Sequence, residues 1–337
     1  MDSSSKDIYE GQFVDLNAII SPVKGDLERF EESLSLLLHS NIPLAAQVVK
    51  YIGRHRGKRL RPSLVLLACK LNGAISEKAI QAGVIVELLH TATLVHDDVV
   101  DNSDLRRGDA TVNKLWSNKI SVLVGDLLFA KTLSAMLDLK DHAMLSVFSE
   151  ATKQITEGEL MQIERDNDFE MDEADYFDLV SKKTASLFSA SCELGALAAR
   201  SSQKNQIRMR DFGQHLGIAF QIKDDLLDYV GDQKRTGKPT GNDIRENKVT
   251  LPLIFALKNS SKTQRDIILT TLNNGVPDDK KIKELVGLVN DIGGVQYSLD
   301  VASQYADMAL EILSTYPDST YHTSLKNLVE FTVLREN

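Results

Sequence analysis

Apolar residues recur at intervals of three and four along most of the chain and seldom alternate with polar ones. This period indicates amphipathic α-helices rather than strands. The clearest helix is predicted from a capping serine, Ser76, to about Asp101, with Ile80, Val84 and Leu88 on one side. A helix of about 25 residues rises roughly 37 Å, so it would cross a whole domain core.

The same periodicity predicts further helices over 119–139, 142–165, 175–200, 203–229, 250–258, 279–291 and 294–315. Gly, Asp, Asn and Pro gather in predicted loops at 102–110, 166–173, 231–247 and 273–278. There is no repeat with a period of 20 to 50 residues and no low-complexity linker. We therefore expect an all-α fold, with one large domain over residues 16–337 behind a disordered tail of residues 1–15.

Composition narrows the class of protein. The 337 residues include 39 Lys and Arg against 48 Asp and Glu, a net charge of -9, which argues against a general nucleic-acid binder because phosphate backbones demand a basic surface. The two cysteines, Cys69 and Cys192, support neither a disulfide framework nor a zinc motif. The sequence shows no signal peptide and no uncharged apolar run of about 18 residues, so we expect a cytoplasmic protein without a membrane span.

An acidic motif closes the long predicted helix. Asp97 and Asp101 are four residues apart, which places both carboxylates on one helix face, about 5 to 6 Å apart at Cβ. A solvated helix end is the ordinary interpretation of such a motif. Here Glu87 is the only charged residue between positions 79 and 95, so the helix looks buried, and three carboxylates (with Asp98) at its negative end would repel one another. A divalent cation such as Mg²⁺, which prefers oxygen ligands, would remove the conflict.

A second acidic motif repeats this spacing late in another apolar helix, at Asp224, Asp225 and Asp228. One degenerate motif recurs easily by chance, but recurrence in the same buried context is much less common. The two motifs together predict two acidic clusters facing one cavity.

Basic segments supply candidate anion sites. Residues 54–62 form the densest basic run and lead directly into apolar helical sequence, with Pro62 expected at the first helical position. A nuclear-localisation or nucleic-acid patch is the usual alternative, but cations beside a helix N-terminus favour phosphate. Arg106 and Arg107 follow the first acidic motif, where they could either neutralise aspartates or grip diphosphate oxygens that a metal also bridges.

Other polar residues are ambiguous alone. Glu159 and Gln162 could support the site or form a polar helix face, and Lys248 is unremarkable. The acidic run at 166–178 imitates a calcium loop, but Met171 and Phe177 stand where that loop requires glycine and glutamate. We interpret it as a solvated connection.

From about residue 20 to the end, the sequence resembles the trans-polyprenyl diphosphate synthases, enzymes that elongate isoprenoid chains. Six motifs in the family's order carry the resemblance: residues 57–62, 89–101, 105–108, 181–185, 220–221 with 224–228, and 237–238 with 242–243. Arg56 departs from the family, which usually has a second glycine there; this leaves the direct phosphate ligands in place and puts the loop's flexibility in question.

The resemblance implies the isoprenoid synthase fold, a helical bundle around a deep central cavity, and a homodimer. It implies two or three Mg²⁺ ions, bound by Asp97, Asp101 and Asp224 with support from Asp98, Asp225 and Asp228. It implies an allylic diphosphate site at Arg106, Lys183, Thr184, Gln221 and Lys238, and an isopentenyl diphosphate site at Lys58, Arg61, His90 and Arg107. Among these, the six aspartates with Arg106, Lys183 and Lys238 would be the catalytic set.

Product length should follow the depth of the cavity. Ala92 and Thr93 lie about one turn before Asp97, where enzymes of this family that stop at farnesyl diphosphate often carry aromatic rings. Small residues there predict a long product, about C35 to C45, for a quinone side chain. Met136, on a stripe with Phe129 and Leu133, is our hypothesis for the floor, with core packing as the alternative for each.

Three alternatives stay open at this point. A farnesyl or geranylgeranyl diphosphate synthase would differ only in product. A terpene cyclase of the same fold usually mixes Asn, Ser or Thr with Glu in its second metal motif, and a noncatalytic helical subunit typically loses the aspartates or cations that are present here. A long lipid product would also favour transient contact with a membrane surface, although no amphipathic anchor is evident.

Overall fold

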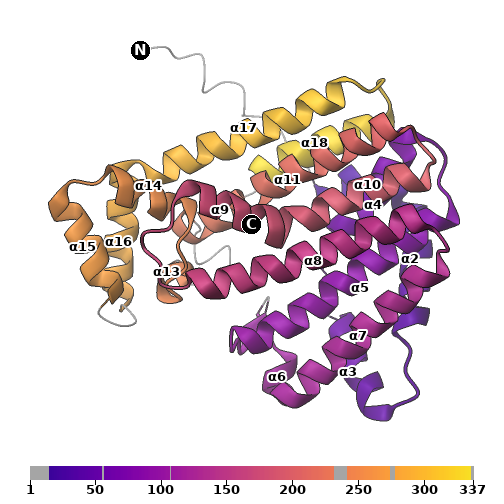
Figure 1. Cartoon of the computed structure of the whole chain (residues 1–337), viewed down its shortest axis with the longest axis horizontal. Helices are drawn as coiled ribbons and strands as arrows, with labels where there is room; N and C mark the ends of the chain where they lie inside the picture. Colours follow the sequence, from indigo (N-terminus) through magenta and orange to yellow (C-terminus); the bar gives the residue numbers. More distant parts are fainter. Residues whose placement is uncertain (1–14, 55–56, 107, 231–240, 274–277, 335–337) are drawn as a thin grey trace.

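The computed structural model describes residues 15–54, 57–106, 108–230, 241–273 and 278–334, and these are almost wholly helical (Figure 1). The expected disordered tail falls almost entirely outside them. The N-terminal elements are α1 (Leu16–Ile20), η1 (Ser21–Val23), α2 (Lys24–Leu38), α3 (Pro43–Arg54), α4 (Leu60–Asn72) and α5 (Glu77–Val100). The antiparallel strands β1 (Leu105–Arg106) and β2 (Asp109–Ala110) form a hairpin inside the predicted loop, followed by α6 (Val112–Leu115), α7 (Asn118–Asp138) and α8 (His142–Arg165).

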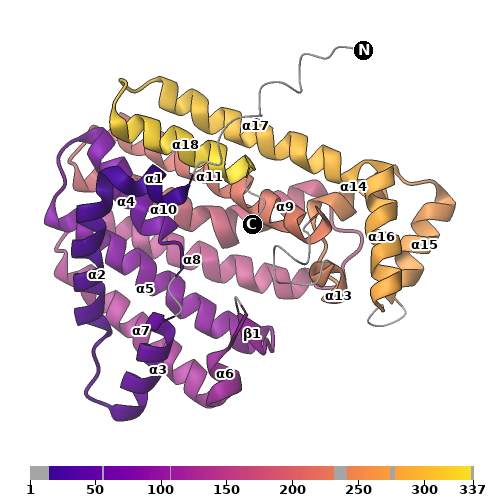
Figure 2. The same ribbon diagram turned by 180° about the vertical axis from the view of Figure 1, so that it is seen from behind.

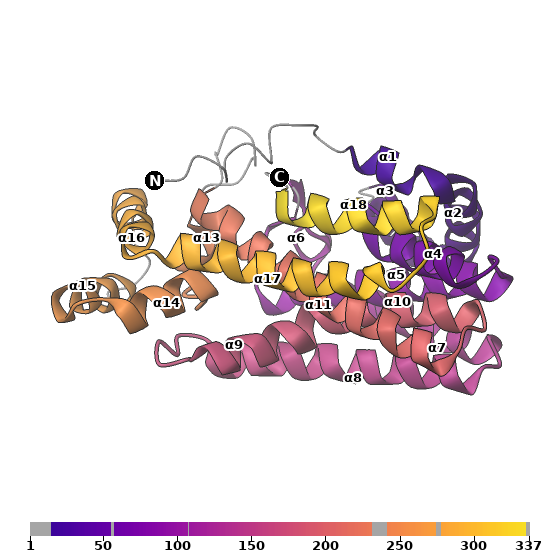
Figure 3. The ribbon, with the colours of Figure 1, turned by 90° about the horizontal axis from the view of Figure 1, so that it is seen from above.

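The C-terminal elements are α9 (Glu173–Val180), η2 (Ser181–Ala185), α10 (Ser186–Ala198), α11 (Gln203–Val230), α13 (Asn242–Arg245), α14 (Leu251–Asn259), α15 (Lys262–Asn273), α16 (Asp279–Ile292), α17 (Gly294–Ser314) and α18 (Thr320–Leu334). Seen from above, α10 and α11 lie between α17 with α18 on one side and α8 with α9 on the other (Figure 3). Helices α14, α15 and α16 gather at one end of the bundle (Figure 1).

Buried apolar side chains form two clusters, one around α4, α5, α7 and α10, the other around α9, α14 and α16. Helix α11 contributes to both, because Phe212 belongs to the first cluster and Ile222 to the second. Helix α17 does the same through Leu313 and Val301. Two long helices therefore connect the clusters.

The long predicted helix is α5, and it is buried as expected. Ser76 is its N-cap residue, but the predicted capping bond is wrong: the Ser76 hydroxyl donates to the carbonyl oxygen of Ala198, 3.0 Å away at the end of α10. Helix α4 begins at Leu60, so Pro62 occupies the third helical position rather than the first. The chain enters α4 through Arg59, whose φ of 52° is in the left-handed region.

The predicted helix over 175–200 is interrupted by a π-helical turn, η2. Two glycines on neighbouring helices let this turn approach closely. A Cβ on Gly158 of α8 would lie 2.6 Å from the Lys183 nitrogen, and one on Gly217 of α11 would lie 2.6 Å from Ala185 Cα. The turn is thus seated between α8 and α11, and π-turns of this kind occur often at functional sites.

Helix α7 packs on α5 through a stripe that includes Val124, Leu128 and Thr132. The predicted role in core packing is therefore wrong for two residues of the stripe, because Phe129 is 42% and Leu133 50% exposed. Met136 is buried. The small residue Gly125 allows the close contact with α5, because a Cβ there would overlap the His96 ring. Helices α5 and α7 are also long and apolar enough to cross a membrane, although the apolar window of α5 is 67% buried.

Candidate active site

The first acidic cluster lies at the C-terminal end of α5. Asp98 is buried and accepts a hydrogen bond of 2.6 Å from Arg106 Nε on β1. The β1–β2 hairpin thus places Arg106 beside the C-terminal end of α5. Asp97 is partly buried and Asp101 is exposed. Burial first, and the charge of Glu159 second, raise the pKa of Asp97 to about 7, against the opposing effect of nearby cations.

Lys183 is one of those cations, and α8 holds it in place. Its Nζ donates to Glu159 Oε2 and to Gln162 Oε1, both at 2.6 Å. Glu159 and Gln162 therefore do more than form a polar helix face. They orient the Lys183 ammonium group, whose charge partly offsets the rise in the Asp97 pKa.

The next residue of the π-turn connects to the second cluster. Thr184 Oγ1 donates to Gln221 Oε1 at 2.7 Å, and Gln221 Nε2 donates to Asp225 Oδ1 at 2.7 Å. The hydroxyl of Tyr176 donates to the other oxygen of Asp225 at 2.6 Å. Burial raises the pKa of Asp225 to about 7, and these two hydrogen bonds oppose the rise. Lys183 and Thr184 are adjacent, so the π-turn carries both a cation that acts electrostatically on Asp97 and a hydroxyl that is hydrogen-bonded toward the second cluster.

Sequence reasoning missed Tyr176, and no motif marks it, since it lies 49 residues before Asp225. It also judged Lys248 unremarkable alone, although Lys248 lies within electrostatic range of Asp101 and Asp243. Burial lowers the pKa of Lys248, but a hydrogen bond to Glu246 and the charges of Glu246, Asp101 and Asp243 outweigh it, so that the pKa is raised.

Asp228 receives support from the chain that follows α11. The backbone nitrogen of Asp243 donates to Asp228 Oδ2 at 2.8 Å, and that of Gly241 donates to the Asp228 carbonyl at 2.9 Å. Burial, followed by the charges of Asp225 and Asp228, raises the pKa of Asp243 well above its usual value. Asp225, Asp228 and Asp243 thus crowd this end of α11, and Asp224 is exposed at its edge.

Two residues of the predicted isopentenyl diphosphate site, Arg61 on α4 and His90 on α5, are in contact. Arg61 Nη1 is 3.0 Å from His90 Nε2, and the Arg61 guanidinium lies 4.8 Å above the Phe188 ring. Lys58 Nζ is 5.9 Å from the ring of Phe331. Arg107 and Lys238 lie outside the described residues, so their predicted roles remain untested.

The donor set fits a hard divalent cation, since every candidate ligand supplies carboxylate oxygen. Over the part of the chain that is described, no three His, Cys, Asp or Glu residues already form a complete metal site. Mg²⁺ commonly takes one or two carboxylates and completes its shell with water and substrate phosphates, so the spread of these aspartates suits a metal that arrives with a diphosphate.

The polyprenyl synthetase family model matches residues 42–289. The chain belongs to the polyprenyl synthetase family. It is 37% identical over 318 residues to the all-trans-nonaprenyl-diphosphate synthase (geranyl-diphosphate specific) of Rhodobacter capsulatus, covering 94% of this chain and 97% of that protein. It is 36% identical over 288 residues to the geranylgeranyl diphosphate synthase of Saccharolobus solfataricus, covering 83% and 86%.

Solved structures of this polyprenyl synthetase family share the fold. The polyprenyl synthase of Caulobacter crescentus CB15, complexed with calcium and isoprenyl diphosphate, superposes with a TM-score of 0.89 at 32% identity, covering 96% of this chain and 98% of that one. The all-α prediction and the isoprenoid synthase fold are confirmed.

Proposed function

We propose that the protein is a Mg²⁺-dependent trans-prenyltransferase that elongates an allylic diphosphate by successive condensation with isopentenyl diphosphate. The observation that carries the proposal is the π-turn, where Lys183 acts electrostatically on Asp97 and Thr184 is hydrogen-bonded to Gln221, which in turn donates to Asp225. A diphosphate bound beside this turn would interact with both acidic clusters. Family membership supports the same class of reaction.

We assign the metal-binding role to Asp97, Asp101 and Asp224, with Asp98, Asp225 and Asp228 as supporting carboxylates. When bound, two or three Mg²⁺ ions would supply positive charge to the diphosphate leaving group. Lys183 and Arg106, with Lys238, would add preorganised positive charge from the protein, which lowers the barrier for breaking the allylic C–O bond.

The second substrate would bind at Lys58, Arg61 and His90, with Arg107. Its double bond attacks the allylic carbocation, a proton leaves, and the chain grows by five carbons. The departing diphosphate is the base we propose, since no side chain is assigned to that step. Water must be kept from the carbocation, and the deep cavity implied by the fold would do this.

For the product we propose a long all-trans chain of about C35 to C45, for a quinone side chain. Ala92 is buried and small, and Thr93 turns its hydroxyl back to the His90 carbonyl at 2.9 Å, so neither residue fills space as a ring would. Met136 is buried on α7 and remains our candidate for the floor. A geranylgeranyl product is the alternative, because relatives of both types match the chain.

We propose that the enzyme works as a cytoplasmic homodimer of single-domain subunits that touches membranes only transiently. The outer face of α7 supports the dimer, since it is apolar although exposed. Its exposed residues are Val122, Leu123, Phe129, Leu133 and Leu137. A second copy covering this face would remove it from water.

The test is incubation of the purified protein with farnesyl diphosphate, labelled isopentenyl diphosphate and Mg²⁺, followed by chromatography of the products. We expect longer prenyl diphosphates, and a loss of at least about 100-fold in Asp224→Asn because a metal ligand is lost. Asp266→Asn, an exposed aspartate on α15, is the matched control. A cyclic hydrocarbon would identify a cyclase, and no release of diphosphate would refute catalysis.

A further inference from the structure

A cavity of about 110 Å³ lies between α5, α2, α3 and the β1–β2 hairpin, and its lining includes His90, Asp98 and Arg106 of the proposed active site. These elements share one side of the molecule (Figure 2). The cavity walls are mostly apolar, from Leu34, Leu38, Ile52, Leu88 and Leu94. This volume approaches that of engineered apolar cavities of about 150 Å³, which take benzene, so we expect room for no more than one aromatic ring.

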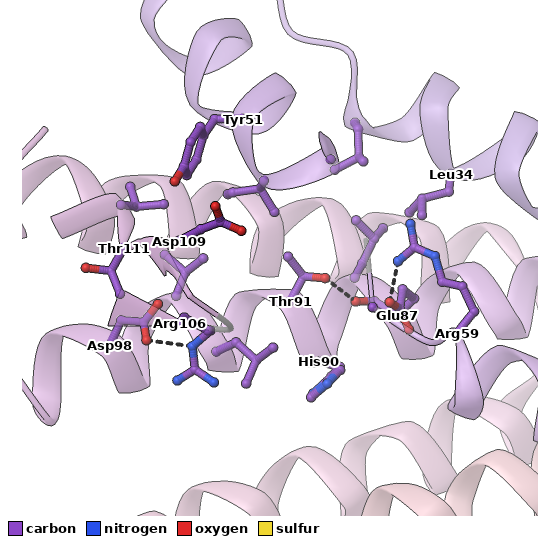
Figure 4. A pocket seen from close by; sticks show the side chains of 18 of the residues that line it. Leu34, Tyr51, Arg59, Glu87, His90, Thr91, Asp98, Arg106, Asp109 and Thr111 are labelled. Carbon is purple, nitrogen blue, oxygen red and sulfur yellow. Dashed lines mark hydrogen bonds and ion pairs between the residues drawn. The ribbon is translucent and has the colours of Figure 1, made fainter. Parts of the chain in front are cut away.

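The cavity adjoins the proposed active site, but Asp97 and Asp101 are not among the residues that line it. Thr91, Leu94 and Asp98 follow one another at helical spacings of three and four and line the cavity. Asp97 and Asp101 lie on the neighbouring face. Figure 4 shows the His90 ring and the Arg106 guanidinium pointing away from Tyr51 and Leu34, toward the opposite side of the helix.

The charged groups in the cavity wall, which include the carboxylate of Asp109, do not suit a second diphosphate. Arg59 is paired with the nearly buried Glu87 and donates to Glu31 at 2.8 Å. Arg106 is paired with Asp98 at 2.6 Å. Each arginine in the wall thus already faces carboxylate oxygen.

Three hydroxyl groups in the wall donate their hydrogens to backbone carbonyls. The Tyr51 hydroxyl donates to the Ala110 carbonyl at 2.6 Å, and the Thr91 hydroxyl to the Glu87 carbonyl at 2.7 Å. The Thr111 hydroxyl donates to the Ser103 carbonyl at 2.7 Å. Because the hydroxyl hydrogens of Thr91 and Thr111 are used within the protein, their oxygens offer only lone pairs to an occupant.

We propose that this cavity is an effector site for a compact, uncharged, mainly apolar molecule with one hydrogen-bond donor, such as a small alcohol or phenol. The occupant packs against the Asp98–Arg106 pair and stabilises the conformation in which Arg106 is bonded to Asp98. It thereby opposes transfer of Arg106 to the allylic diphosphate. This coupling rests on the proposed function, whereas binding to the cavity does not.

Phenol is the probe, and toluene, of similar size but without a donor, is its matched partner. By calorimetry or NMR we expect saturable phenol binding, about fivefold tighter than that of toluene, the factor expected for one neutral hydrogen bond. Ile52→Phe, which fills the cavity, should weaken phenol binding at least tenfold, and Ile267→Phe on α15 should not. If Ile52→Phe does not fold, Leu38→Phe fills the same space from α2.

Saturable binding that Ile52→Phe leaves intact, equal binding of toluene, or no saturable binding at all would each overturn the site. In the prenyl transfer assay, phenol should raise the KM for farnesyl diphosphate severalfold to a plateau and leave that for isopentenyl diphosphate unchanged, since coupling between two sites saturates. An increase without limit would indicate competition at the active site and would overturn the coupling, as would no effect. An inactive protein that still binds phenol in this way supports the cavity and refutes the proposed enzyme.

Discussion

Replacing Tyr176 by phenylalanine tests how the buried network controls the second acidic cluster. The substitution keeps the ring in the core and removes only the hydroxyl that donates to Asp225 at 2.6 Å. Burial, followed by the charge of Asp225, raises the pKa of Tyr176 well above its usual value, so the hydroxyl remains a donor at every working pH. A hydrogen bond to a charged group contributes about 1.5 to 3 kcal/mol.

That energy translates into a change in ionisation. One pKa unit corresponds to about 1.4 kcal/mol, so loss of the bond should raise the Asp225 pKa by about one to two units. From a starting value of about 7, the ionised fraction at pH 7 would fall from about one half to between about one tenth and one hundredth. We therefore expect activity at pH 7 and subsaturating Mg²⁺ to fall about 5- to 50-fold, with most of it recovered at pH 9.

Stability provides a second measurement with the opposite pH trend. Because the Asp225 pKa is raised in the folded state, that state binds its proton more tightly than the unfolded chain does, and stability falls as pH rises from about 4 to 7. In Tyr176→Phe this fall should extend to about pH 8 to 9, visible in melting curves. Tyr297→Phe, which removes a 2.8 Å bond to Glu173, is the control. Equal losses of activity at pH 7 and pH 9 would refute the reasoning.

Three other substitutions probe separate parts of the proposal. Phe188→Leu removes the ring beneath Arg61 and should raise the KM for isopentenyl diphosphate roughly 5- to 30-fold, leaving that for the allylic substrate unchanged; equal changes in both would show a general packing defect. Met136→Ala should lengthen the products by one or more five-carbon units in chromatography, whereas the exposed Met308→Ala should not, and an unchanged length distribution would remove Met136 from the floor. Leu133→Lys should halve the mass measured by light scattering and Ile267→Lys should not; a monomeric wild-type protein would refute the dimer.

Periodicity was enough for the helical class because it depends on local spacing. The strongest example is α5, where a single charged residue in 17 positions revealed burial before any packing was known. Periodicity failed where a neighbour supplied the decisive contact. The Ser76 hydroxyl donates to the Ala198 carbonyl rather than capping its own helix. The π-turn fits between α8 and α11 because Gly158 and Gly217, both distant in sequence, leave room for it.

The candidate site divides in the same way. Motif spacing identified the aspartates, because chelation needs carboxylates on one helix face. It could not identify Tyr176, whose role depends only on the approach of α9 to α11, or decide between two interpretations of Glu159 and Gln162. The face of α7 was misplaced because a shift of one residue rotates a helix by about 100°, and only the packing against α5 fixes that rotation.

Gly158 and Gly217 set how closely α8 and α11 approach the π-turn that carries Lys183 and Thr184. They act as recesses on opposite sides of the π-turn, and the helices that carry them also bear Glu159 and the second aspartate motif. A methyl group added at either position would overlap the backbone of the π-turn. Alanine at either position should therefore shift α8 or α11 relative to the π-turn while the side chains proposed for catalysis stay chemically unchanged.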